Sequence, residues 1–237
     1  MNFEQPIRTP WNDFPDVLIH ATESMVKKNS NYAAAKAGDV IAARRLVESV
    51  LSESSVDHLR IRLAGIDASL ASVHAYEADG INRIPAVLAE VLAERLGLRA
   101  EETVVQTNRT GHTGAGGFHR LAHPALFAGE VKAGRRYLLV DDFVGQGGTL
   151  ANLKGYLESQ GGLTIMATTL TGKPYSAKLC PTDTTLAGLR AKHDEQLENW
   201  WENAFGYGFD FLTESEARYV ERADNTDSIR DRVLAAR

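Results

Sequence analysis

The middle of the chain, about residues 58–175, alternates short apolar runs with longer amphipathic ones. Short runs rich in β-branched residues favour strands, whereas apolar positions repeated every three or four residues favour helices. Strands that alternate with helices in this way predict an α/β fold, with an open, mostly parallel sheet flanked by helices. The predicted strands are residues 59–66, 103–107, 137–140 and 163–170, and the predicted helices are residues 84–96, which end at Gly97, and 150–159.

The two ends of the chain have helical patterns instead. Residues 31–51 are rich in alanine, and Asp39 is placed to cap a helix within them. Toward the other end, residues 186–203 favour a helix, and Thr213-x-x-Glu216 is a capping box that opens a further helix. The chain therefore divides into a helical N-terminal segment, an α/β core and a helical C-terminal appendage, with bounds of 1–57, 58–175 and 176–237.

Composition narrows the class of partner and the compartment. Acidic residues number 31 against 26 basic ones, so no overall positive field attracts nucleic acid, although a local basic groove remains compatible with these numbers. The single cysteine, Cys180, cannot form an internal disulfide, and the N-terminus lacks the basic start and apolar core of a signal peptide. No apolar run approaches the roughly 20 residues that span a bilayer. We expect a cytoplasmic protein without a membrane partner.

Residues 137–149 carry the candidate chemistry, with the sequence Tyr-Leu-Leu-Val-Asp-Asp-Phe-Val-Gly-Gln-Gly-Gly-Thr. Asp141 and Asp142 follow the predicted strand directly, and ligands of open parallel sheets bind beyond the carboxyl ends of the strands. A glycine-rich turn before a helix lets backbone N–H groups approach a phosphate. The carboxylates can accept hydrogen bonds from a ribose diol, while a hydrated Mg²⁺ offsets their charge. A ribose 5-phosphate therefore fits the pattern, with the phosphate held by Val144, Gly145, Gln146, Gly147, Gly148 and Thr149.

Three other interpretations of the acidic pair can be weighed from the sequence. A nucleotide-hydrolase Walker B strand requires an upstream Gly-x-x-x-x-Gly-Lys-Ser/Thr loop, and the chain contains no such string. A response-regulator receiver domain also carries Leu-Val-Asp-Asp but opens with it, whereas here residues 1–140 precede the pair. The third interpretation is a strand that ends in two solvated aspartates before an ordinary turn, with no ligand.

This segment resembles the signature of the type I phosphoribosyltransferases, which is four apolar residues, two acids, two variable apolar residues and then Thr-Thr-Gly-Gly-Thr. Gly145 and Gln146 stand where the family has its first two threonines, and the other signature positions are in register. The resemblance implies transfer of the phosphoribosyl group of 5-phosphoribosyl diphosphate to or from a nitrogenous base. It also implies that Asp141 and Asp142 hold the diol, favour the cationic ribose of the transition state and contact Mg²⁺ through water.

Further residues follow from the same resemblance. The string Gly80-Ile81-Asn82-Arg83 before an Ala/Leu-rich helix looks like the ComF-type branch of the family. The loop at residues 66–74, which includes Ser69 and His74, would contact pyrophosphate, and Arg83 belongs to the same candidate set. Lys173 lies where some members hold the acceptor base. Relatives also lead us to expect a homodimer, whereas no string identifies the acceptor base or nucleotide.

Residues 109–117, Arg-Thr-Gly-His-Thr-Gly-Ala-Gly-Gly, have the composition of a mobile loop. By position they resemble the flexible lid of phosphoribosyltransferases, which implies that Arg109 acts in catalysis. Arg109 or His112 would neutralise departing pyrophosphate and exclude water from the reactive carbon. A solvated connection is the alternative interpretation. His119 and His123 share a helical spacing that suits zinc, but no third ligand accompanies them.

Two alternative functions stay open at this point. Regulatory relatives of these enzymes bind phosphoribosyl diphosphate or a nucleotide without transferring it, and the replacement of two threonines by Gly145 and Gln146 keeps that function open here. The ComF-like string suggests instead an accessory role in DNA uptake or mobile-element biology.

Overall fold

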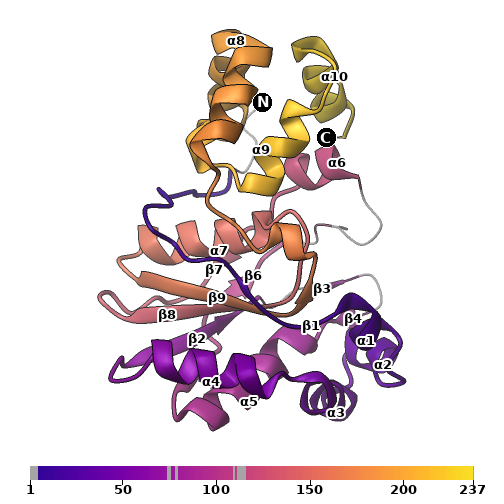
Figure 1. The fold of residues 1–237 in the computed structure, drawn as a ribbon, viewed down its shortest axis with the longest axis vertical. Helices are drawn as coiled ribbons and strands as arrows, with labels where there is room; N and C mark the ends of the chain where they lie inside the picture. The colour runs from indigo at the N-terminus through magenta and orange to yellow at the C-terminus, as the bar shows by residue number, and fades with distance from the viewer. Residues whose placement is uncertain (1–4, 74–75, 78–79, 109, 111–115, 237) are drawn as a thin grey trace.

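The strand that carries the acidic pair lies at the centre of a five-stranded parallel sheet with the order β1-β9-β8-β2-β5, and all four neighbouring pairs run parallel. The computed structural model describes residues 5–73, 76–77, 80–108, 110 and 116–236. The strands are β1 Leu18–Ala21, β2 Ala68–Ser72, β5 Arg99–Glu101, β8 Arg136–Val144 and β9 Leu163–Gly172. The predicted fold, an open parallel sheet flanked by helices, is confirmed (Figure 1).

Helices cover both faces of the sheet, which explains why the central strand is apolar throughout. Successive side chains of a strand point to opposite faces. Leu138 and Val140 of β8 accordingly join a core with helices α3, α4 and α5, while Tyr137 and Leu139 join a second core with α7. Figure 1 shows α4 and α5 below the sheet and α7 above it. The bounds of these helices are α3 Val40–Val50, α4 Glu53–Arg62, α5 Ile84–Leu96 and α7 Gly148–Ser159.

Helices near the C-terminus build a separate hydrophobic core above α7. Helices α8 Asp183–Phe205, α9 Glu214–Glu221 and α10 Thr226–Ala236 bury Trp201, Phe205 and Phe209 among them. Helix α6, Gly117–Ala122, belongs to the same core through Phe118 and Leu121, although the chain enters it from the sheet domain. We call α6, α8, α9 and α10 the helical cap (Figure 1). Trp201 is fully buried, so it packs the core of this cap.

The remaining elements are short. Two antiparallel ladders stand apart from the main sheet, one between β3 and β4 and one between β6 and β7. Helices α1 and α2 follow β1, and two 3₁₀ turns flank α8. The bounds are α1 Glu23–Lys27, α2 Tyr32–Lys36, β3 Tyr76–Glu77, β4 Gly80–Ile81, β6 Val105–Gln106, β7 Phe127–Ala128, η1 Pro174–Ser176 and η2 Phe209–Phe211. Among the helices of the described residues, none has both the length and the apolar composition needed to cross a membrane.

An extended segment at the N-terminus, residues 5–17, runs across α7 from the cap to β1, and we call it the N-terminal strap (Figure 1). The indole of Trp11 is buried and donates to the carbonyl of Leu212 at 2.8 Å. The ammonium of Lys154 on α7 donates to the carbonyl of Pro10 at 2.8 Å. The strap therefore ties α7 to the segment that precedes α9.

Several sequence predictions are confirmed by these elements. The helix at residues 84–96 has the predicted bounds and ends at Gly97 in the left-handed conformation, and residues 163–170 lie within β9. Asp39 caps α3, and the capping box at Thr213 and Glu216 opens α9.

Other strand predictions were wrong. Residues 59–62 are the last turn of α4 and residues 63–66 lie beyond it, because Ser52 caps that helix and Val56, Leu59 and Leu63 repeat at helical spacing on its buried side. The core strand is β2, inside the segment predicted as a loop at residues 66–74. At residues 103–107 only a two-residue ladder forms, and the core strand there is β5. The N-terminal segment is also not wholly helical, since its β1 pairs with β9 at the sheet edge.

Candidate functional site

A cavity of about 930 Å³ opens at the C-terminal edge of the sheet. The core supplies its floor through Asp141, Asp142 and the turn at residues 145–149, while the N-terminal helices and the helical cap supply its walls. Among the described residues that line it, basic side chains outnumber acidic ones by seven to four. The basic residues are Arg8, Lys27, Lys36, Arg120, Lys173, Arg218 and Arg222, and the acidic ones are Glu23, Asp141, Asp142 and Glu216. The lining therefore favours an anionic ligand.

The acidic pair reaches this cavity because strands of the sheet end at different levels. Strand β8 does not end at Val140 as predicted but continues through both aspartates to Val144, pairing with β9 on one side. On its other side β2 ends at Ser72, opposite Val140. Asp141 and Asp142 therefore lie just beyond the end of a neighbouring strand, which leaves their carboxylates at the open edge of the sheet.

Asp142 is held by two donors, one from α2 and one from the residue pair that precedes α5. Its Oδ2 accepts hydrogen bonds from Lys36 Nζ at 3.1 Å and from Asn82 Nδ2 at 3.0 Å. Burial alone would raise the pKa of Asp142, but Lys36 and Asn82 outweigh that effect and hold the pKa below its usual value. This role of Lys36 was not predicted, because in the sequence Lys36 is only a single cation in an alanine-rich segment.

Asp141 has the opposite electrostatic environment. Its side chain is buried, and its Oδ1 accepts the backbone N–H of Asp142 at 2.7 Å. Burial and the neighbouring charge of Asp142 raise the pKa of Asp141 well above its ordinary value. The two carboxyl groups therefore take up their first proton on Asp141, while Asp142 stays ionised beside Lys36.

The glycine-rich turn brings the start of α7 to the same cavity. Gly147 adopts the left-handed conformation with φ of 84° and has no side chain to cap the helix. Added Cβ atoms at Gly147 and Gly148 would approach Leu179 Cδ2 to 2.5 Å and Glu216 Oε1 to 2.4 Å, so a side chain at either position would have to displace one of these groups. The start of α7 consequently has no side-chain cap, and its first residues line the cavity, as an anion site at a helix N-terminus requires.

The side chains of the turn divide between cavity and core. Val144 is buried in the core with α7, and its carbonyl accepts the N–H of Lys173. Gln146 lines the cavity, and both polar atoms of its amide are buried without a hydrogen-bond partner among the described residues. The backbone carbonyl of Gln146 accepts a hydrogen bond from the hydroxyl of Thr213 at 2.5 Å.

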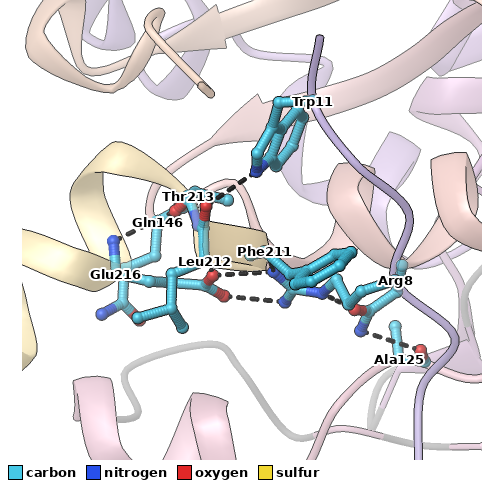
Figure 2. Close-up of polar contacts among 9 residues, drawn as sticks. Arg8, Trp11, Ala125, Gln146, Phe211, Leu212, Thr213 and Glu216 are labelled. Carbon is cyan, nitrogen blue, oxygen red and sulfur yellow. Dashed lines mark hydrogen bonds and ion pairs between the residues drawn. The ribbon is translucent and has the colours of Figure 1, made fainter. Parts of the chain in front are cut away.

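A buried ion pair lies beside the first turn of α7. Arg8 of the N-terminal strap donates to both carboxylate oxygens of Glu216 on α9, at 2.9 and 3.0 Å (Figure 2). Arg8 also donates to the carbonyl of Phe211 at 2.9 Å and to Asn152 Oδ1 at 2.6 Å. Burial opposes the charge of Arg8, yet Glu216 outweighs it and raises the pKa of the guanidinium above its usual range. The pair thus neutralises a carboxylate that lies next to the candidate phosphate site.

The other predicted site residues lie in different places. Lys173 lines the cavity and forms an ion pair with Glu23. Ser69 lies at the opposite end of β2 and does not line the cavity, and its hydroxyl accepts a hydrogen bond from Arg135 Nε at 2.9 Å. Arg83 lines a separate hollow of about 90 Å³ near β5. His74, Arg109 and His112 lie outside the described residues.

The predicted histidine pair forms a ring stack. His119 and His123 have ring centroids 4.2 Å apart, and His123 Nδ1 lies 3.2 Å from the carbonyl of His119. In the part of the chain that the structure describes, no cluster of three or more His, Cys, Asp or Glu side chains could hold a metal ion. The two rings therefore pack on each other at α6, and among the described residues no further ligands accompany them for a zinc site.

Comparison with known proteins gives two curated relatives. The chain is 40% identical over 236 residues to Protein TraN of Escherichia coli, covering 100% of this chain and 53% of that protein. It is 34% identical over 164 residues to an uncharacterized protein of Haemophilus influenzae, covering 69% of this chain and 37% of that protein. The chain thus spans about half the length, or less, of these relatives. No family model matches the chain.

Solved structures similar to part of the chain include two phosphoribosyltransferases. The purine phosphoribosyltransferase of Pyrococcus horikoshii has a TM-score of 0.36 and 16% identity, over 52% of this chain and 74% of that one. A hypoxanthine phosphoribosyltransferase of Staphylococcus aureus has a TM-score of 0.36 and 15% identity, over 60% of this chain and 67% of that one.

Proposed function

We propose that the cavity binds 5-phosphoribosyl diphosphate and that the protein transfers its phosphoribosyl group to or from a nitrogenous base. The observation that supports this most directly is the joint position of the acidic pair and the uncapped start of α7, which line one cavity. A ribose 5-phosphate needs both kinds of group, because its hydroxyls donate to carboxylates and its phosphate accepts from N–H groups. The resemblance of residues 137–149 to the phosphoribosyltransferase signature is consistent with the same ligand.

In the proposed reaction, a nitrogen of the base attacks carbon 1 of the ribose. The bond from that carbon to nitrogen forms while the bond to the diphosphate oxygen breaks, and the electron pair leaves with pyrophosphate. Positive charge develops on the ribose ring, and the carboxylate of Asp142, which Lys36 keeps ionised, would favour it. Negative charge grows on the departing pyrophosphate, and the basic residues of the cavity wall are suited to offset it.

The residues at the acidic pair fit a hydrated Mg²⁺ that arrives with the diphosphate. Lys36 and Asn82 already engage Oδ2 of Asp142, so direct coordination through that oxygen would require both donors to move. Contact through water with the remaining oxygens of Asp141 and Asp142 needs no such movement. Such an ion would supply charge neutralisation for the leaving group, while Lys36 holds Asp142 in place.

A non-catalytic function is the second candidate, in which the same cavity binds phosphoribosyl diphosphate or a nucleotide as a signal. One observation favours it: the side chain of Gln146, which replaces a threonine of the signature, brings a buried amide to the cavity in place of a hydroxyl. The ComF-like accessory role stays a prediction from the string at residues 80–83 and is addressed by a gel shift with nucleic acid. Cytoplasmic location and a homodimer likewise stay predictions.

Two measurements test the proposed function. Isothermal titration should show binding of 5-phosphoribosyl diphosphate that is stronger with Mg²⁺ and is weakened by Asp142→Asn. Pyrophosphate release in the presence of a panel of bases should then identify the acceptor. Binding without release from any base would favour the signal-binding candidate, and absence of binding to the wild-type protein would refute both.

A further inference from the structure

Arg120 reaches the phosphate turn from the helical cap. It lies on α6, whose Phe118 and Leu121 are buried in the core of the cap. The ring of Tyr219 on α9 packs over the start of α6, because a Cβ at Gly117 would lie 2.4 Å from it. The rings of Phe118 and Tyr219 meet edge to face with centroids 5.0 Å apart. The cap therefore fixes α6 and, with it, the origin of the Arg120 side chain.

Gly145 of the turn makes room for this side chain. An ideal Cβ at Gly145 would lie 3.0 Å from Arg120 Nη1 and 3.1 Å from Phe143 Cε1, which is tighter than ordinary van der Waals contact. Gly145 is not among the glycines with positive φ, so its backbone conformation does not demand glycine. Because Gly145 has no side chain, it leaves space in the turn, and the guanidinium of Arg120 lies next to that space.

Glycine in place of the signature threonine at position 145 changes the kind of hydrogen-bond donor at the turn. At position 145 the phosphoribosyltransferase signature has a threonine, whose hydroxyl is a neutral donor. Here the nearest side-chain donor is a guanidinium, which binds phosphate oxygens through charge-assisted and often bidentate hydrogen bonds. Arg120 also lines the cavity together with Gly145 and Gln146.

We infer that Arg120 is a ligand-binding residue of this cavity and that it takes over at the turn the anion contact that a threonine at position 145 would supply. Its ligand is a phosphate group, and the inference rests on the proposed function for the sugar that carries it. The phosphate is either the 5-phosphate of the ribose or part of the diphosphate. Position favours the 5-phosphate, because Gly145 belongs to the turn that precedes α7.

The test is isothermal titration of wild-type protein and variants with ribose 5-phosphate and, separately, with inorganic pyrophosphate. Arg120→Gln should weaken ribose 5-phosphate by about 10- to 100-fold, the range for loss of a hydrogen bond to a charged group. Gly145→Thr crowds the guanidinium but supplies the hydroxyl of the signature, so the double variant Arg120→Gln with Gly145→Thr should bind ribose 5-phosphate more tightly than Arg120→Gln alone. Arg120→Lys keeps the charge and should retain part of the affinity.

Arg232→Gln is the matched control, because Arg232 lies over the ring of Phe118 at 5.6 Å but does not line the cavity. It should leave both affinities unchanged. A larger loss for pyrophosphate than for ribose 5-phosphate would place Arg120 at the diphosphate and overturn the assignment to the 5-phosphate. Unchanged affinity of folded Arg120→Gln for both ligands would overturn the inference while the proposed function stands. Failure of the wild-type protein to bind either ligand or 5-phosphoribosyl diphosphate would overturn both.

Discussion

Removal of Arg8 should destabilise the whole protein, because this side chain joins three parts of the fold. It extends from the N-terminal strap, and its partners lie on α7, in the turn η2 and on α9. The side chains of Arg8 and Glu216 are only 3% and 4% exposed. Arg8→Met keeps most of the volume and apolar length but removes the charge and every donor.

The expected loss can be estimated from these contacts. Removing one partner of a buried ion pair leaves an uncompensated charge and costs about 3–5 kcal/mol. Arg8→Met also leaves the carbonyl of Phe211 and Asn152 Oδ1 without their donor, but Glu216 retains the backbone N–H of Thr213 at 2.8 Å. We therefore expect a loss of about 4 kcal/mol in the free energy of unfolding. That is a large share of the free energy of unfolding of a folded domain, which is roughly 5–15 kcal/mol.

Urea denaturation of a double-mutant cycle measures this effect. Glu216→Gln keeps the capping geometry while removing the charge. Arg8→Met with Glu216→Gln should lose less than the sum of the single losses by about 2 kcal/mol, because neither variant residue leaves a buried charge. Arg44→Met breaks the exposed pair with Glu94 and should leave the free energy of unfolding within experimental error. Strictly additive losses, or an Arg8→Met effect as small as that of Arg44→Met, would refute the reasoning.

Three further predictions concern other parts of the fold. Burial lowers the pKa of His20 to about 4, so the folded state resists protonation. The unfolded chain takes up the proton below a pKa of about 6.5, so His20 should lower the free energy of unfolding by up to about 3 kcal/mol between pH 6.5 and 4. Denaturation curves of His20→Leu should lack this contribution. Gly155→Ala should destabilise by about 1–3 kcal/mol, although alanine favours a helix, because its Cβ would lie 2.0 Å from a backbone oxygen of the strap; a stabilised variant would contradict the packing. Lys36→Met should raise the pKa of Asp142 in a carboxyl NMR titration, and an unchanged pKa would argue against the ion pair.

Local sequence patterns predicted those elements whose signals are complete within a few residues. The helix that ends at Gly97 has its apolar repeat and its left-handed glycine together, and the capping box of α9 needs only Thr213 and Glu216. The wrong strand prediction at residues 59–66 also has a local cause. Apolar residues and arginine alternate there as in a strand, but the buried residues Leu59 and Leu63 are four apart, as in a helix. Strand β2, with its sequence Ala-Ser-Leu-Ala-Ser, has weak strand propensity and is a strand because its neighbours β5 and β8 pair with it.

The candidate site also contains residues that a local pattern predicts and residues that only the fold brings together. Asp141, Asp142 and the glycine turn were predicted because their spacing along the chain is itself the signal. Lys36, which engages Asp142 at a separation of 106 residues, carries no local mark of that role. Arg120 was likewise hidden beside a predicted lid, and only the packing of α6 into the cap brings it to Gly145. Such contacts depend on the assembled fold, so a single sequence cannot specify them.

The two appendages that flank the core are parts of the candidate site, as their shared contact at α7 demonstrates. The carboxylate of Glu216, from the cap, lies so close to the first turn of α7 that it would repel a phosphate there if it stood alone. Arg8, from the strap, neutralises that carboxylate across a separation of 208 residues. With the cap docked, an anion can therefore approach the turn only when the strap is docked as well. Stability and ligand affinity should consequently fall together in Arg8→Met, whereas Arg120→Gln should lower affinity with little change in stability.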